Sequence, residues 1–351
     1  MTQSVLTAAP VLTAAMEDRD QHPDEAVKQR VKLLGELVRR RLQKDWTAEA
    51  HLDQVCGYAV SAPGKFFRPI LLLESASTVG GEIDRVLPAA AGAEGAHVAS
   101  LVHDDIIDGD EVRRGMPAVH VAFGRDDALV GGDALIFYLF SALAECGRRG
   151  IEAARIVMAM AMAAEAGREL CRGQMLEKEL RASYDSRVAS YLDMVAGKTG
   201  ALFRASCSIG AVLGGGSVDA LGRYGALLGY AFQIQDDLLP YLSTPDVTGK
   251  PPTSDLANRR LTLPFLLCRA AAGAVRVQVL DELLTGGGEN DIDDRFKRLS
   301  DLLSESGALD QAADMAARYC AEAIDALAAL PSSTSKDVLV YFAESAALRS
   351  R

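Results

Sequence analysis

Apolar residues recur along most of the chain at three- and four-residue spacing, which is the period of an amphipathic helix. Glycine and proline interrupt this pattern, and runs of β-branched residues are few. The pattern predicts helices over residues 25–44, 46–61, 67–79, 85–107, 126–148, 151–182, 186–213, 218–239, 263–272, 275–284, 291–304, 307–329 and 335–348.

Strands do not alternate with these helices, and no Pro- or Ser-rich linker divides them. We therefore expect an all-α fold, a single helical domain over residues 24–351 whose core can hold a site built from facing helices. Residues 1–23 are mostly small and apolar but lack a basic leading segment, which predicts a loosely ordered tail and not a signal peptide.

Charge and composition narrow the function. The 351 residues carry a formal net charge of −11, which argues against a general nucleic-acid binder. Six scattered cysteines without a C-x-x-C pair predict reduced thiols and a cytoplasmic protein. No segment reaches the ~18 uncharged apolar residues of a spanning helix, so we expect no transmembrane segment.

The strongest chemical signal is a D-D-x-x-D pattern at the end of a long apolar helix. Asp104 and Asp108 are four residues apart and project from one helix face, with Asp105 beside them. Clustered carboxylates favour a hard divalent cation, here Mg²⁺. Arg113 and Arg114 follow with forked donors that suit phosphate oxygens, so the segment predicts chemistry on a diphosphate.

Other signals are weaker when each is taken alone. Asp236 and Asp237 close a second apolar helix, although most Asp-Asp pairs are surface residues or helix caps. Lys198 could equally be an exposed helix lysine, and His97 could be an ordinary core histidine. His97 lies seven residues before Asp104, two turns away on nearly the same helix face, which favours a place in the site.

Taken together, the motifs resemble those of the trans-isoprenyl diphosphate synthases, the polyprenyl synthetase family. The matching segments are G-K-x-x-R-P from residue 64, H-x-x-S-L-x-H-D-D-x-x-D from 97, R-R-G-x-P from 113, G-Q from 173, K-T-G from 198, F-Q-x-x-D-D from 232, G-K-P from 249 and T-L-P from 262. The resemblance implies an isoprenoid synthase-type helical bundle, usually a homodimer, whose two acidic motifs face each other across a central cavity. It also implies Mg²⁺, three ions per active site, and the condensation of isopentenyl diphosphate with dimethylallyl, geranyl or farnesyl diphosphate.

The resemblance also assigns residues. The implied metal ligands are Asp104, Asp105, Asp108 and Asp236, with Asp237 and Asp255 close by. The implied contacts of the allylic diphosphate are Arg113, Lys198 and Lys250, with Thr199 and Gln233 adjoining, and Arg260 stands where the family commonly has lysine. The implied pocket for isopentenyl diphosphate comprises Gly64, Lys65, Arg68, His97 and Arg114.

Two positions depart from the family pattern. Pro240 replaces the usual third aspartate of the second motif, and we expect the helix to stop early there. The acid of G-Q-x-x-D is Glu177 in this chain.

In this family, bulky aromatic residues four or five positions before the first aspartate stop chain growth early. Here these positions are Ser100 and Ala99, and the small residues upstream, Gly92, Ala93, Gly95 and Ala96, predict an open channel along the helix. The aromatic side chains of Phe137 and Tyr138 are candidates for the floor of that channel, or for ordinary core packing. The expected product is geranylgeranyl diphosphate (C20) or longer.

Two alternatives stay open. A class I terpene cyclase also uses an aspartate-rich helix and magnesium, but it needs no second diphosphate pocket. A non-catalytic regulatory subunit of a heteromeric synthase is compatible with the change at Pro240, although its first acidic motif would be expected to be lost.

Overall fold

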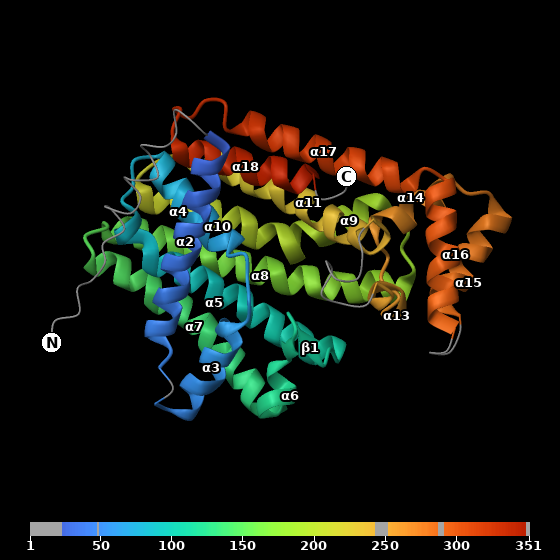
Figure 1. Ribbon diagram of the computed structural model, residues 1–351, viewed down its shortest axis with the longest axis horizontal. Helices are drawn as coiled ribbons and strands as arrows, with labels where there is room; N and C mark the ends of the chain where they lie inside the picture. Colours follow the sequence, from blue (N-terminus) through green and yellow to red (C-terminus); the bar gives the residue numbers. More distant parts are fainter. Residues whose placement is uncertain (1–22, 48, 243–251, 287–290, 349–351) are drawn as a thin grey trace. The chain divides into compact units, whose positions relative to one another are not determined.

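The computed structural model describes residues 23–47, 49–242, 252–286 and 291–348, and these are almost entirely helical (Figure 1). The predicted all-α fold is confirmed. Residues 1–22 of the predicted tail and Lys250 lie outside the described residues.

The helices group into two compact units. Unit 1 comprises residues up to Glu165, Phe203–Arg223 and Ala326–Phe342, and unit 2 comprises Ala166–Leu202, Tyr224–Asp325 and the residues from Ala343. The single-domain organisation stays a prediction.

The first part of unit 1 contains the N-terminal helices and a short hairpin. Its elements are α2 (Pro23–Asp45), α3 (His51–Ser61), α4 (Phe67–Thr78), α5 (Ile83–Asp108), β1 (Val112–Arg113), β2 (Met116–Pro117), α6 (Val119–Phe123) and α7 (Arg125–Arg148). The hairpin and α6 are not predicted by the periodicity, because neither is long enough to show a period.

The remaining elements divide between the units or belong to unit 2. They are α8 (Ala153–Ser183), α9 (Val188–Val195), the π-helical turn η1 (Ala196–Gly200), α10 (Ala201–Gly214), α11 (Asp219–Leu242), α13 (Ser254–Ala257), α14 (Leu263–Ala271), α15 (Ala274–Thr285), α16 (Ile292–Glu305), α17 (Ala308–Ala326) and α18 (Thr334–Leu348).

Helices α5 and α7 form the closest pair in unit 1 and run side by side in Figure 1. Glycines make this approach possible: a Cβ on Gly92 would lie 3.0 Å from the Leu139 Cα, and a Cβ on Gly95 would lie 2.9 Å from the Tyr138 ring. The predicted open channel is therefore wrong at Gly92 and Gly95, whose missing side chains admit α7.

A buried ion pair joins α2 to α4 in unit 1. The Arg30 Nη2 donates to Glu74 Oε2 at 2.8 Å and also to Ser335 Oγ at 3.1 Å. Glu74 is fully buried, so the forked guanidinium supplies the partners that a buried carboxylate requires.

The core of unit 2 gathers leucines and aromatic residues of α9, α11, α14, α15 and α16 around Phe265, Leu263 and Leu280. Two predicted boundaries are wrong here. The helix expected over 186–213 is interrupted by η1, and α11 continues past Pro240 to Leu242. The helix survives because Pro240 lies in its last turn and removes only the backbone bond to the Asp236 carbonyl.

Candidate active site

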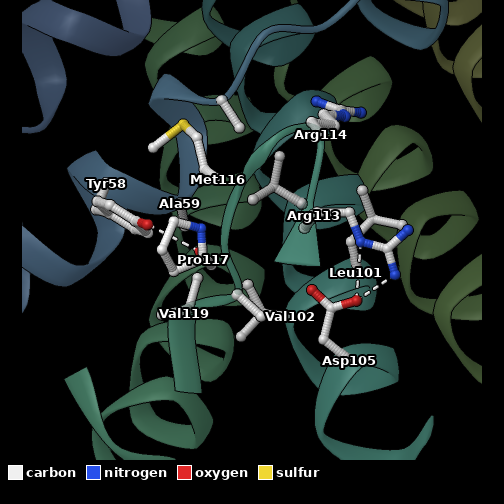
Figure 2. Close-up of a pocket in the computed structure, with 13 residues that line it drawn as sticks. Tyr58, Ala59, Leu101, Val102, Asp105, Arg113, Arg114, Met116, Pro117 and Val119 are labelled. Atoms are coloured by element: carbon white, nitrogen blue, oxygen red, sulfur yellow. Dashed lines mark hydrogen bonds and ion pairs between the residues drawn. The ribbon is translucent and has the colours of Figure 1, made fainter. Parts of the chain in front are cut away.

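The first acidic motif ends α5 in unit 1. Asp104 and Asp108 are partly exposed and lie one turn apart, whereas Asp105 is only 2% exposed. The Asp105 carboxylate accepts a hydrogen bond from Arg113 Nε at 2.8 Å, and Arg113 also lies 3.3 Å from Asp110. Asp105, predicted as a metal ligand, is thus held by Arg113 and in turn fixes it, as Figure 2 shows.

Both arginines lie on the hairpin that follows. Strands β1 and β2 pair Val112 with Pro117 and Arg113 with Met116. Arg114 and Gly115 form its tip in left-handed conformations, with φ of 52° and 78°. Two successive positive φ angles match the twist of a tight hairpin, so the R-R-G segment folds back instead of continuing the helix.

Four of the residues assigned to the second substrate come together in unit 1. A Cβ on Gly64 would lie 2.8 Å from Arg114 Nη1, so the absence of a side chain admits the guanidinium. The Arg68 guanidinium stacks on Phe203 at 4.5 Å. Burial, followed by the charges of Arg68 and Arg114, lowers the pKa of His97 well below its usual value, so the surroundings disfavour its protonated form.

Lys65 is exposed in the loop that precedes α4. The next residue, Phe66, has a φ of 50°, which is uncommon for a non-glycine residue and costs backbone energy. Its ring is buried and lies under the Arg39 guanidinium at 5.2 Å. Packing of Phe66 therefore fixes the turn that carries Lys65 and Arg68.

Glu94 belongs to this pocket but was not predicted. It is only 3% exposed and lies one turn before His97. Burial raises the pKa of Glu94, while the charges of Arg114 and Arg68 oppose that rise. The i, i+3 spacing of Glu94 and His97 on one helix is the signal that could have identified it.

The four candidate chain-length residues have different surroundings. Ala99 is fully buried, and Ser100 is partly exposed with its hydroxyl donating to the His97 carbonyl at 2.7 Å. Phe137 is 70% exposed, so its predicted role as a floor beside α5 is wrong within this chain. Tyr138 does face α5, and its hydroxyl donates to Asp45 of α2.

In unit 2, Lys198 and Thr199 lie in the π-helical turn η1. Such turns are frequent at functional sites because they displace side chains from the helical register. The turn packs against α8 through glycine: a Cβ on Gly173 would lie 2.2 Å from the Lys198 backbone nitrogen. The Lys198 Nζ donates to Glu177 Oε2 of α8 at 2.7 Å.

The second acidic motif lies on α11. Asp236 is partly exposed, and Asp237 is 5% exposed. The Asp237 carboxylate accepts hydrogen bonds from Tyr191 Oη at 2.8 Å, Gln233 Nε2 at 3.0 Å and the Leu263 amide at 3.0 Å. Burial, with the charge of Asp255, raises the pKa of Asp237 to about 6. Asp237 is thus engaged by neutral protein donors, and its place among the metal ligands stays a prediction.

Gln233 connects this carboxylate to η1. The Thr199 hydroxyl donates to Gln233 Oε1 at 2.6 Å, which orients the Gln233 amide nitrogen towards Asp237. Arg260 lies 3.1 Å from Asp255 and 3.9 Å from Glu177. The structure thus joins Lys198, Thr199, Gln233, Asp237, Asp255 and Arg260 through direct contacts, with Glu177 as an additional member.

These donors fit a magnesium ion only with help from other ligands. Within the described ranges, no three His, Cys, Asp or Glu side chains gather as a complete metal site. Mg²⁺ commonly takes one or two carboxylates and completes its shell with water and substrate phosphate. Partly exposed carboxylates such as Asp104, Asp108 and Asp236 suit that mode of binding.

Comparison with known proteins agrees with this chemistry. The sequence profile of the polyprenyl synthetase family matches residues 49–301. The geranylfarnesyl diphosphate synthase of Aeropyrum pernix is 38% identical over 289 residues, covering 80% of this chain and 89% of that protein.

Two solved structures are also similar. The geranylgeranyl pyrophosphate synthetase of Pyrococcus horikoshii has a TM-score of 0.84 and 32% identity, covering 93% of this chain and 99% of that one. The polyprenyl synthase of Caulobacter crescentus, solved with calcium and isoprenyl diphosphate, has a TM-score of 0.80 and 30% identity, covering 95% and 98%.

Proposed function

The chain belongs to the polyprenyl synthetase family and is a trans-prenyltransferase, and from this premise we propose that it condenses isopentenyl diphosphate head-to-tail with an allylic diphosphate. The observation that carries the proposal is the joint presence of partly exposed Asp104 and Asp108 and a second pocket of Arg68, His97 and Arg114. The second diphosphate pocket argues against a terpene cyclase, which binds one diphosphate substrate. The intact first acidic motif argues against a non-catalytic regulatory subunit.

Each unit contributes its own groups. In unit 1, Arg113 binds the allylic diphosphate, and Gly64, Lys65, Arg68, His97 and Arg114 bind isopentenyl diphosphate. In unit 2, Lys198 and Arg260 supply cations for the allylic diphosphate, while Thr199, Gln233 and Asp237 keep the surrounding backbone in place. Lys250 keeps the same predicted role.

Asp104 and Asp108 in unit 1 and Asp236 in unit 2 are the residues that would hold Mg²⁺, with three ions per active site. When bound, the metal neutralises the diphosphate and makes it a better leaving group. Asp105 and Asp255 act through the arginines that they contact. The calcium in the related Caulobacter crescentus structure supports divalent-metal binding in this family.

The chain's own residues orient the two substrates and exclude water. The double bond of isopentenyl diphosphate attacks the allylic carbon, the new carbon–carbon bond forms, and the allylic carbon–oxygen bond breaks. A proton then leaves the former isopentenyl unit, and the departing diphosphate accepts it. Catalysis therefore rests on positioning and on stabilisation of diphosphate charge.

The product is geranylgeranyl diphosphate (C20) or longer. Ala93, Ala96, Ser100 and Asp104 follow one another at helical spacing and are all partly exposed, so small side chains extend upstream from the first aspartate. Relatives named for geranylgeranyl and geranylfarnesyl products lie within this range, whereas relatives named for farnesyl diphosphate lie below it.

Product analysis tests the activity. Purified protein, farnesyl diphosphate, isopentenyl diphosphate and Mg²⁺ should give a C20 or longer product by mass spectrometry. Asp104→Asn and Asp108→Asn should each lower kcat by about a hundredfold or more, while Asp133→Asn, at an exposed position on α7, should not. Failure to extend farnesyl diphosphate would refute the chain-length assignment, and unchanged turnover in both motif variants would refute the site.

A substitution on the upstream face tests chain length separately. Ser100→Phe should shorten the main product because it places a ring one turn before Asp104. Ala99→Phe is the contrasting variant, since Ala99 is fully buried and a ring there should destabilise the fold. An unchanged product distribution in Ser100→Phe would show that the tail grows elsewhere.

The protein acts as a homodimer through the outer face of α7 and the adjoining part of α8. The support is that both helices carry exposed large apolar side chains: Leu129, Val130, Ile136 and Phe137 on α7, and Val157 and Met158 on α8. Helix α7 is also long and apolar enough to cross a membrane by composition, with 39% of its apolar window buried. Sedimentation should give a dimer that Phe137→Glu dissociates and Val275→Glu, at another exposed apolar position, does not. Monomeric wild-type protein would refute the dimer.

We place the enzyme in the cytoplasm. All six cysteines are free thiols, and five of them are buried. Buried free thiols are typical of proteins that stay in a reducing compartment.

A further inference from the structure

The hairpin that carries the two arginines is too short to hold its own position. Its strands have two residues each and two cross-strand pairs. An isolated hairpin is at best marginally stable in water, even when its strands are longer. The place of Arg114 therefore depends on what holds the hairpin to the helices around it.

The outgoing strand is held by charge. Arg113 on β1 donates from Nε to Asp105 of α5 at 2.8 Å and lies 3.3 Å from Asp110. A backbone bond from the Ala118 amide to the Glu111 carbonyl, at 2.8 Å, closes the base of the hairpin. These contacts fix one strand and the base.

The returning strand, β2, is held by a neutral side chain from a different helix. The Tyr58 hydroxyl of α3 donates to the Pro117 carbonyl on β2 at 2.8 Å, which Figure 2 shows as a dashed line. The Tyr58 ring is itself fixed edge-on against Phe123 of α6, with 5.2 Å between ring centroids. Tyr58 thus ties α3 to the strand that follows Arg114 and Gly115.

Packing beneath the hairpin is incomplete. A cavity of about 30 Å³ lies there, large enough for a water molecule but lined mostly by apolar side chains (Figure 2). Its apolar lining includes Ala59, Ala62, Val98, Leu101, Val102 and Met116. Because the apolar side chains around this cavity do not fill it, the hydrogen bonds at the ends of the hairpin contribute to its position over α5.

We propose that Tyr58 is a positioning residue that sets the Arg114 guanidinium in the isopentenyl diphosphate pocket, an inference that rests on the proposed function of that pocket. The guanidinium has little room to shift towards Gly64, because Arg114 Nη1 lies 2.8 Å from the place that a Gly64 Cβ would occupy. A hairpin released from Tyr58 lets Arg114 move away from Gly64 and Lys65. The binding of isopentenyl diphosphate weakens, while Asp104 and Asp108 on α5 keep their places.

The test is Tyr58→Phe, which removes the hydroxyl and keeps the ring. With saturating allylic diphosphate, KM for isopentenyl diphosphate should rise about fivefold, the loss expected for one hydrogen bond, while kcat and the unfolding midpoint stay close to wild type. The matched control is Ser61→Ala on the same helix, which removes a hydroxyl that donates to the Tyr58 carbonyl at 2.8 Å. Ser61→Ala should leave KM for isopentenyl diphosphate and kcat unchanged.

A double variant separates this proposal from the pocket assignment. Arg114→Gln alone should raise KM for isopentenyl diphosphate, and adding Tyr58→Phe should raise it no further. If the two effects multiply, or if Tyr58→Phe lowers kcat and stability together, Tyr58 does not act through Arg114 and the proposal is overturned. If Arg114→Gln leaves KM unchanged, the pocket assignment itself fails, and any effect of Tyr58→Phe needs another cause.

Discussion

Both aspartate pairs bury their second member, but they hold it by different chemistry. In unit 1, Asp105 is held by the charged Arg113, which is itself proposed to contact substrate. In unit 2, Asp237 is held by a phenol, an amide side chain and a backbone amide, all neutral. The first aspartate of each pair, Asp104 or Asp236, stays partly exposed.

We call the contact of Arg113 with Asp105 the charged hold, and the three hydrogen bonds to Asp237 the neutral hold. The two respond to different changes. A charged hold is strong, but it weakens when either partner loses its charge or when the hairpin moves. A neutral hold is short-range and depends on close packing, here on the approach of η1 to α8 at Gly173. The following predictions test this contrast, beginning with the packing that the neutral hold requires.

Gly173→Ala should have the largest effect. Its Cβ would lie 2.2 Å from the Lys198 backbone nitrogen, so α8 and η1 must separate. We expect a loss of about 3 kcal/mol in the free energy of unfolding, measured by urea denaturation. The matched control is Gly167→Ala on the same helix, where nothing lies within 4 Å; it should gain up to about 1 kcal/mol. Similar values for both variants would show that η1 does not need the close approach.

Asp105→Asn should come next and should affect activity. The substitution replaces the carboxylate that Arg113 contacts with a neutral amide, which can still accept a hydrogen bond but no longer balances the guanidinium charge. We expect kcat/KM for the allylic substrate to fall about thirtyfold, or about 2 kcal/mol. Asp237→Asn keeps a group that can accept from Tyr191 and Leu263, and its loss should be about fivefold. Equal losses in steady-state assays would contradict the distinction between charged and neutral holds.

The parts of the fold that repeat with helical period could be predicted from the sequence. Helices such as α7 and α8 match the expected ranges within a few residues. The π-turn could not be predicted, because residues 196–200 do not break the apolar period of the helix. It is marked by a tertiary contact at Gly173, and single-chain periodicity carries no information about such contacts.

The candidate site, like the fold, has features that the sequence predicts and features that depend on tertiary packing. The residue types and spacing of the two acidic motifs indicate which side chains do chemistry, but neighbouring residues on a helix point about 100° apart. Which aspartate of a pair is buried depends on what packs against the helix. The same reason explains Gly92 and Gly95, where small residues admit α7 instead of opening a channel.

Thr199→Val tests the neutral hold directly. It removes the hydroxyl that donates to Gln233 Oε1 at 2.6 Å, so the Gln233 amide is free to turn away from Asp237. We expect a loss of about 1.5 kcal/mol in the free energy of unfolding. Thr285→Val is the control, since its hydroxyl donates to a backbone carbonyl on an exposed face and should change little. An unchanged Thr199→Val protein would show that Gln233 is oriented by other contacts.

Glu145→Gln should have the smallest effect. It tests whether another charged contact of unit 1, between Arg41 and Glu145, weakens in acid. The Arg41 guanidinium donates to both Glu145 oxygens, at 2.8 and 2.6 Å, and lowers the pKa of Glu145 from 4.5 to about 2. A lowered pKa stabilises the fold at neutral pH, and this contribution is lost as the pH falls from 4.5 towards 2. The variant should therefore be about 0.5 kcal/mol less stable at neutral pH, and the difference should shrink over that acidic range. Glu152→Gln, in an exposed pair with Arg155, should show no such difference. A difference for Glu145→Gln that persists unchanged in acid would mean that lost packing, and not lost charge, is the cause.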